Sequence, residues 1–114
     1  MWLFTRDGFV SAVQHRDDPD LLLVRARVAS HLWRLCEYNG GDPVYDVIET
    51  PRADYRFRIT VHKNIAAQFV ASEIQAIDYD NFKASLPHLN AKHQAYADAC
   101  SKVWSAMLRL QEPE

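Results

Sequence analysis

The sequence is poor in glycine and lacks the short motifs that mark common catalytic sites. Its three glycines, Gly8, Gly40 and Gly41, all stand in turn-forming stretches, so no glycine-rich phosphate loop is present. Neither Gly-x-Ser-x-Gly nor Cys-x-x-Cys occurs. These absences favour a non-catalytic protein. Acid–base chemistry by Asp78 with Tyr79 or His62 remains an open alternative.

Cysteine is scarce, and the hydrophobic runs are short. Cys36 and Cys100 lie far apart in the sequence, and without a secretory signal we expect both to be reduced core residues. No run is long and apolar enough to span a membrane. The five histidines show no helical i, i+4 pair, so we expect no metal and no cofactor. These features predict a cytoplasmic protein.

Neither sign of charge dominates the sequence. Thirteen Lys and Arg residues stand against 15 Asp and Glu residues, which gives a formal net charge of −2. A dedicated nucleic-acid-binding protein is usually basic, so that function is disfavoured, although a local basic patch is not excluded. A chain of 114 residues is long enough for one hydrophobic core, and we expect a single domain over residues 1–114.

The hydrophobic patterns predict strands first and helices later. We expect strands at residues 2–6 and 9–15, joined by the Asp7-Gly8 turn, and further strands at 21–28 and 54–61. Helices are expected at residues 30–38, 64–77 and 91–110, the last with Asn90 as its N-cap. Residues 44–51 are ambiguous, with Val47-Ile48 as a possible edge segment. The β-β-β-α-β-α-α order predicts an α+β fold, in which helices pack on one face of a mainly antiparallel sheet of about four strands.

Two of the expected strands carry paired arginines. Because side chains alternate along a strand, Arg25 and Arg27 point away from Val24, Ala26 and Val28. In the strand at 54–61 the same alternation separates two arginines from the apolar set: Arg56 and Arg58 lie on one side and Tyr55, Phe57, Ile59 and Val61 on the other. If the two strands lie close in one sheet, four guanidiniums share a face.

Two interpretations of this arginine-bearing face remain open. Arginine binds phosphate and carboxylate in a bidentate manner, which suits an anion-binding site. Alternatively, the arginines are solvated, cross a subunit interface, or pair with acids of this chain. The acids considered for such pairs are Asp17, Asp18, Glu49 and Asp54.

The segment at residues 77–83 is a second candidate. Asp78 can orient an arginine, Tyr79 can stack on a flat ligand, and Lys83 adds a positive charge. The same residues also suit a helix cap anchored by Phe82. The large aromatics, including Trp2 and Trp104, are expected mostly in the core. An exposed Trp33 would mark a contact surface.

Several segments together resemble a family of short bacterial proteins without an assigned activity. They are Met-Trp-Leu-Phe-Thr at residues 1–5 with Asp7-Gly8-Phe9, Val-Arg-Ala-Arg-Val at 24–28, Asp-Tyr-Arg-Phe-Arg at 54–58, Ile-Asp-Tyr-Asp-Asn-Phe-Lys at 77–83, and Tyr96 with Val103-Trp104. The resemblance covers nearly the whole chain. It implies a bacterial origin and carries no mechanism.

The sequence therefore leads to two functional hypotheses. The first is a binding module for an anionic small molecule, a nucleotide or a phosphorylated metabolite, with its site residues drawn from both candidates: Arg25, Arg27, Arg56, Arg58, Asp78, Tyr79 and Lys83. The second is a protein-interaction or self-association module, for example a homodimer.

Overall fold

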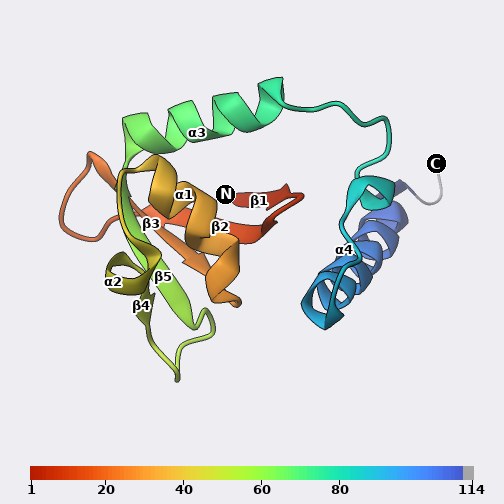
Figure 1. The fold of residues 1–114 in the computed structure, drawn as a ribbon, viewed down its shortest axis with the longest axis horizontal. Helices are drawn as coiled ribbons and strands as arrows, with labels where there is room; N and C mark the ends of the chain where they lie inside the picture. Colours follow the sequence, from red (N-terminus) through yellow and green to blue (C-terminus); the bar gives the residue numbers. More distant parts are fainter. Residues whose placement is uncertain (112–114) are drawn as a thin grey trace. The chain divides into compact units, whose positions relative to one another are not determined.

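The computed structural model describes residues 1–111, and the chain divides into two compact units, Met1–Ile77 and Asp78–Glu114 (Figure 1). Each unit is described by itself below, and the expectation of one domain stays a prediction. Within residues 1–111, no helix combines the length and apolar character needed to cross a membrane.

The first unit is built on a five-stranded antiparallel sheet, which confirms the α+β prediction. The strand order is β1-β2-β3-β5-β4. The strands are β1 (Trp2–Thr5), β2 (Gly8–Gln14), β3 (Leu21–Ala26), β4 (Ile48–Glu49) and β5 (Phe57–His62). The first three form the expected meander. The additional strand, β4, pairs with β5 at the sheet edge. It includes Ile48, which the sequence indicated as part of a possible edge segment.

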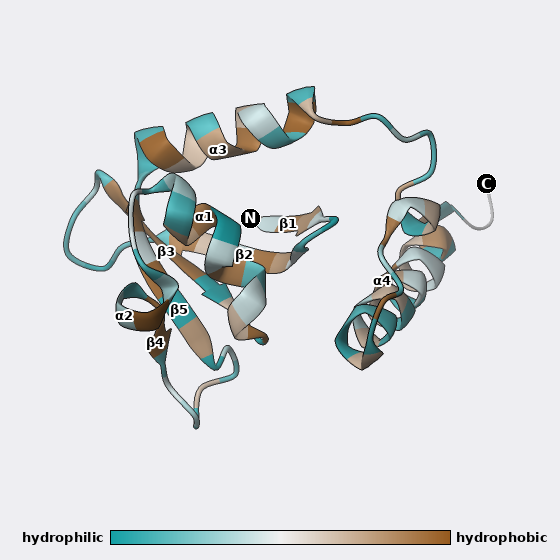
Figure 2. Ribbon diagram, in the orientation of Figure 1, coloured by the Kyte–Doolittle hydropathy of each residue, from teal (hydrophilic) through white to brown (hydrophobic). Residues whose placement is uncertain are grey.

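Helices cover one face of this sheet. A 3-10 turn, η1 (Ala29–Leu32), leads directly into α1 (Trp33–Tyr38), and α3 (Lys63–Gln75) follows β5 without a loop. Alternate strand residues and the inner helix residues form one buried cluster: Val10, Val24, Ala26, Leu32, Leu35, Cys36, Ile59, Val61 and Phe69. Figure 2 shows the matching mixture of hydrophobic and hydrophilic positions along the strands and α3. A short helix, α2 (Pro43–Asp46), precedes β4 and is capped by the Asp42 side chain.

The strand expected at residues 54–61 begins later than its alternation suggested. A turn at residues 50–53 lies between β4 and β5, and β5 starts only at Phe57. Tyr55 therefore does not share the helix-covered face with Phe57, Ile59 and Val61, and this part of the prediction is wrong. Its ring lies 6.4 Å from that of Phe9, because Tyr55 is outside the strand and free of the strand's alternation.

The second unit is helical over its described part. It contains η2 (Lys83–Ser85), α4 (Ala91–Leu108) and η3 (Arg109–Gln111). The Asn90 side chain accepts a 2.9 Å hydrogen bond from the His93 amide, which confirms the predicted N-cap. Two residues of α4, Ala97 and Cys100, are buried. Trp104 is 54% exposed, which contradicts its expected core position.

Candidate functional site

One row of directly paired residues crosses the sheet on the face opposite the helices. Trp2 pairs with Ser11, Ser11 with Arg25, Arg25 with Arg58, and Arg58 with Ile48. Residues paired directly across antiparallel strands point to the same side of a sheet. We call this side the arginine face and define it by eight residues: Trp2, Phe4, Phe9, Ser11, Arg25, Arg27, Tyr55 and Arg58.

Tyr55 lies at the centre of the arginine face, beneath two guanidiniums. The central carbon of the Arg25 guanidinium is 4.5 Å from the Tyr55 ring centroid, and that of Arg27 is 4.3 Å away. The Tyr55 side chain is only 5% exposed. Cation–π contacts of this kind contribute about 0.5–1 kcal/mol each at exposed sites. The Tyr55 ring therefore contacts both guanidiniums and stabilises their positions on the arginine face.

Neutral groups provide the hydrogen bonds of the three central arginines. Arg25 donates to the Ser11 hydroxyl (3.0 Å), Arg27 to the Asp54 carbonyl oxygen (3.1 Å), and Arg58 to the Tyr55 carbonyl oxygen (3.2 Å). Within residues 1–111 none of the three forms an ion pair with a carboxylate. The Nε atoms of Arg25 and Arg58 are shielded from solvent and have no hydrogen-bond partner. A buried donor without a partner is uncommon in proteins. The positive charge of these three arginines is therefore not neutralised by an acid of the described residues.

Arg56 differs from the other three arginines. Its Nε and Nη2 atoms both lie 2.7 Å from Glu49 Oε2, because β4 pairs with β5 and brings Glu49 opposite Phe57. Its charge is therefore already balanced. The expected set of four arginines is reduced to three, and the intramolecular pairing considered for Glu49 occurs at Arg56.

An aromatic group adjoins the arginines on the same face. The rings of Phe4 and Phe9 stack with centroids 4.6 Å apart, and Trp2 meets Phe9 edge to face at 5.6 Å. Trp2 is 67% exposed, so its expected core position is wrong. The alternation of β2 already contained the signal, because it places Phe9 with Ser11 and away from Val10.

The site candidates of the segment at residues 77–83, namely Asp78, Tyr79 and Lys83, belong to the second unit. The Lys83 ammonium lies 4.2 Å from the Trp104 ring centroid, and the rings of Tyr79 and Phe82 are 5.9 Å apart. A pocket shared by Asp78 and the arginines stays a prediction.

The remaining reactive groups show little activation. Burial raises the pKa of the thiols of Cys36 and Cys100, which disfavours the nucleophilic thiolate. No cluster of three His, Cys, Asp or Glu side chains suited to a metal ion occurs among residues 1–111. Trp33 is 49% exposed on α1, and a contact surface at this residue stays a prediction.

Comparison with known proteins adds no family to this description. No protein-family model matches the sequence, and neither the curated proteins nor the solved structures contain a match.

Proposed function

We propose that the protein is a non-catalytic binding module that takes an anionic ligand, a nucleotide or a phosphorylated metabolite, on Arg25, Arg27 and Arg58. The observation that carries the proposal is the gathering of three guanidiniums without a carboxylate partner. Like charges in one place repel each other, and a bound phosphate relieves that repulsion with charge-assisted hydrogen bonds.

A nucleotide fits the face better than a phosphorylated sugar. Trp2 stands two strands away from Arg25 in the same row, which corresponds to about 10 Å at the usual strand spacing. A base stacked on Trp2 would direct its phosphate towards the arginines. Stacking of a base on an aromatic side chain contributes about 1–3 kcal/mol.

The test is a thermal melt at low salt with AMP, ADP, glucose 6-phosphate and inorganic phosphate. A ligand at a hundred times its Kd adds about 2.7 kcal/mol of stability, which raises the midpoint by several degrees in a domain of this size. We expect the nucleotides to give the largest shift. Added salt should reduce it, because exposed charges are screened.

Arg56 offers a matched control for this experiment. The double variant Arg27→Gln and Arg58→Gln should lose the shift, whereas Arg56→Gln should keep it, because Glu49 already balances Arg56. A flat panel, or a shift that survives in the double variant, would overturn the proposal.

A second candidate, self-association, is favoured by the exposed Trp33 on α1. Aromatic residues are enriched at protein interfaces. Light scattering should then show an oligomer that Trp33→Ser converts to a monomer. A monomeric parent protein at all concentrations would contradict this candidate.

A further inference from the structure

An apolar cleft of about 490 Å³ lies in the first unit, on the side of the sheet opposite the arginine face. The floor of the cleft is the helix-facing side of β1, β2 and β3, including Leu3, Val10 and Leu22. The helix α3 forms the opposite wall. Small-molecule sites typically have volumes of about 300–1,000 Å³ and mostly apolar linings. The cleft has both properties and is separate from the site proposed above.

Small side chains on α3 keep the cleft open. Ala67 and Ala71 lie one turn apart and line the cleft, and only a methyl group extends from each of them. Ile74 follows on the same side of the helix and is 61% exposed. Apolar surface left in water forfeits about 25 cal/mol per Å² of the free energy that burial would give. An apolar occupant would recover it.

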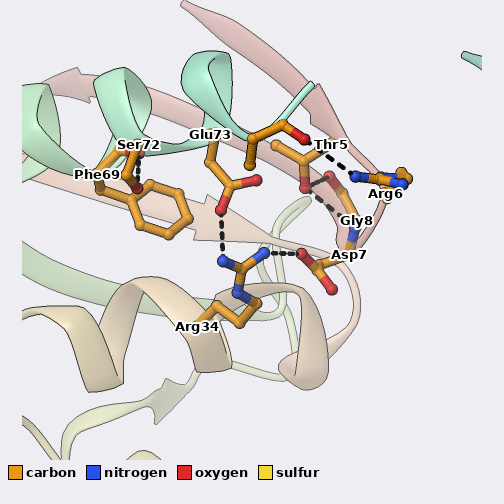
Figure 3. A network of polar contacts seen from close by, with 9 residues as sticks. Thr5, Arg6, Asp7, Gly8, Arg34, Phe69, Ser72 and Glu73 are labelled. Carbon is orange, nitrogen blue, oxygen red and sulfur yellow. Dashed lines mark hydrogen bonds and ion pairs between the residues drawn. The ribbon is translucent and has the colours of Figure 1, made fainter. Parts of the chain in front are cut away.

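A network of polar contacts holds α3 and the sheet together at one end of the cleft. The Arg34 guanidinium bridges Asp7 in the β1–β2 turn and Glu73 on α3, the latter at 2.8 Å (Figure 3). Arg6 of the same turn donates a 3.4 Å hydrogen bond to the Ala76 carbonyl oxygen. These contacts tie the turn to the last turns of α3. The two acids also balance the charge of Arg34, so this end does not attract an anion.

A single cation, Lys63, lies at the opposite end of the cleft, and its backbone amide donates a 2.9 Å hydrogen bond to the Asp20 carbonyl oxygen. Lys63 is the first residue of α3, lines the cleft and forms no ion pair within residues 1–111. No side chain caps the N-terminus of α3, and its first turn has no acidic residue. The helix dipole adds positive potential there. From Lys63 to Ile74 the helix rises by about 16 Å, so the cleft is long, apolar and cationic at one end.

We infer that this cleft binds a free carboxylic acid with an unbranched alkyl chain. The chain lies along α3 between Val70 and the floor residues Leu3 and Val10, and the carboxylate meets Lys63 at the N-terminus of the helix. Such a ligand matches the cleft, because its alkyl chain is apolar along its length and its single negative charge lies at the end that meets Lys63.

Titration calorimetry of the full chain with dodecanoate, below its micelle concentration, tests this inference. We expect saturable binding. Ala71→Phe, or Ala67→Phe should the first variant fold poorly by circular dichroism, fills the cleft and should weaken binding by about tenfold or more. Lys63→Gln should weaken it about two- to fivefold, the range of an exposed ion pair. Lys102→Gln, an equal change of charge on α4, should leave it unchanged.

Three results would overturn the inference. The first is absence of binding, and the second is equal binding of dodecyltrimethylammonium, which has the same chain and the opposite charge. The third is a dimer that the filling variant dissociates, because a second copy would then occupy the cleft. The double variant Arg27→Gln and Arg58→Gln should bind dodecanoate as the parent protein does. Failure of the nucleotide proposal can therefore be distinguished from failure of this inference.

Discussion

Gly8 opens β2 at a backbone conformation that few other residues adopt. Its φ is +148°, and a Cβ added there would lie 2.1 Å from Cγ of His31. Gly40 has a φ of +79°, but a Cβ there meets no atom within 4 Å. The two glycines therefore separate the cost of backbone strain from the cost of a steric clash.

Gly8→Ala should lower the free energy of unfolding by more than about 2 kcal/mol, because backbone strain and overpacking each cost about 1–3 kcal/mol. Gly40→Ala should cost about 1–2 kcal/mol, the penalty for a left-handed conformation alone. Urea denaturation of both variants measures the difference. Equal losses would show that His31 moves aside freely.

His31 gives the stability of the first unit a dependence on pH. Its ring is half-buried, and its Nδ1 accepts a 3.2 Å hydrogen bond from the Phe9 amide, which requires that nitrogen to be unprotonated. Burial lowers the pKa of His31 below 6.5, against smaller opposing effects of the Phe9 backbone and of Asp7. As pH falls below about 6.5, the unfolded chain takes up the proton first.

The contribution of His31 is therefore fully present above pH 6.5 and is lost as pH falls towards the folded-state pKa. Unfolding free energies at pH 8 and pH 5 should differ more in the parent protein than in His31→Gln. An equal difference in the two proteins would contradict the assigned effect of burial.

The sequence could predict the arginine face only in part. Alternation correctly placed Arg25 and Arg58 away from the core, because both lie inside regular strands. It failed for Tyr55, which precedes β5. Glu49 was one of four acids considered as arginine partners, and the sequence could not single it out for Arg56, because that contact depends on the order of the strands. Trp2 was assigned to the core by residue type, although a tryptophan at a sheet edge has one solvated side.

The helices show how local chemistry sets the bounds of an element. Asn90 begins α4 at the predicted residue because its side chain satisfies a free amide of the first turn. The start of α1 was less predictable, since a 3-10 turn precedes it and Leu32 provides no capping side chain. Local capping groups can be read from a sequence, whereas a helix continued from another turn leaves a weaker signal.

Asn90→Ala should destabilise α4 by about 1 kcal/mol through loss of the 2.9 Å bond to the His93 amide. Amide exchange in the first turn of α4 reports this directly. Asn90→Asp keeps the acceptor and should leave exchange nearly unchanged. Faster exchange in both variants would mean that the cap bond contributes little.

At the scale of the whole molecule, the fold class followed from the order of the elements, whereas the strand order did not. The long connection between α1 and β5 permits several placements of β5, and the sheet places it between β3 and β4. Pairing between strands that are far apart in the sequence depends on which strand edges remain unpaired as the core forms. Local sequence patterns do not encode this.

Leu32 should stabilise the first unit as a whole, because it is fully buried in the cluster shared by strands and helices. Leu32→Ala should cost about 2–5 kcal/mol and shift a single cooperative transition. Leu110→Ala, at an exposed position, should change stability by less than about 0.5 kcal/mol. Urea unfolding followed by circular dichroism compares the two, and similar losses would contradict this description of the core.

The three tryptophans have a practical consequence for spectroscopy. Trp2, Trp33 and Trp104 are each about half exposed or more, and a hydrated indole emits at nearly the same wavelength in folded and unfolded chains. Intrinsic fluorescence will therefore follow unfolding poorly. It should instead report contacts at the surface, and quenching of Trp2 by a stacked base would give an optical signal for occupancy of the arginine face.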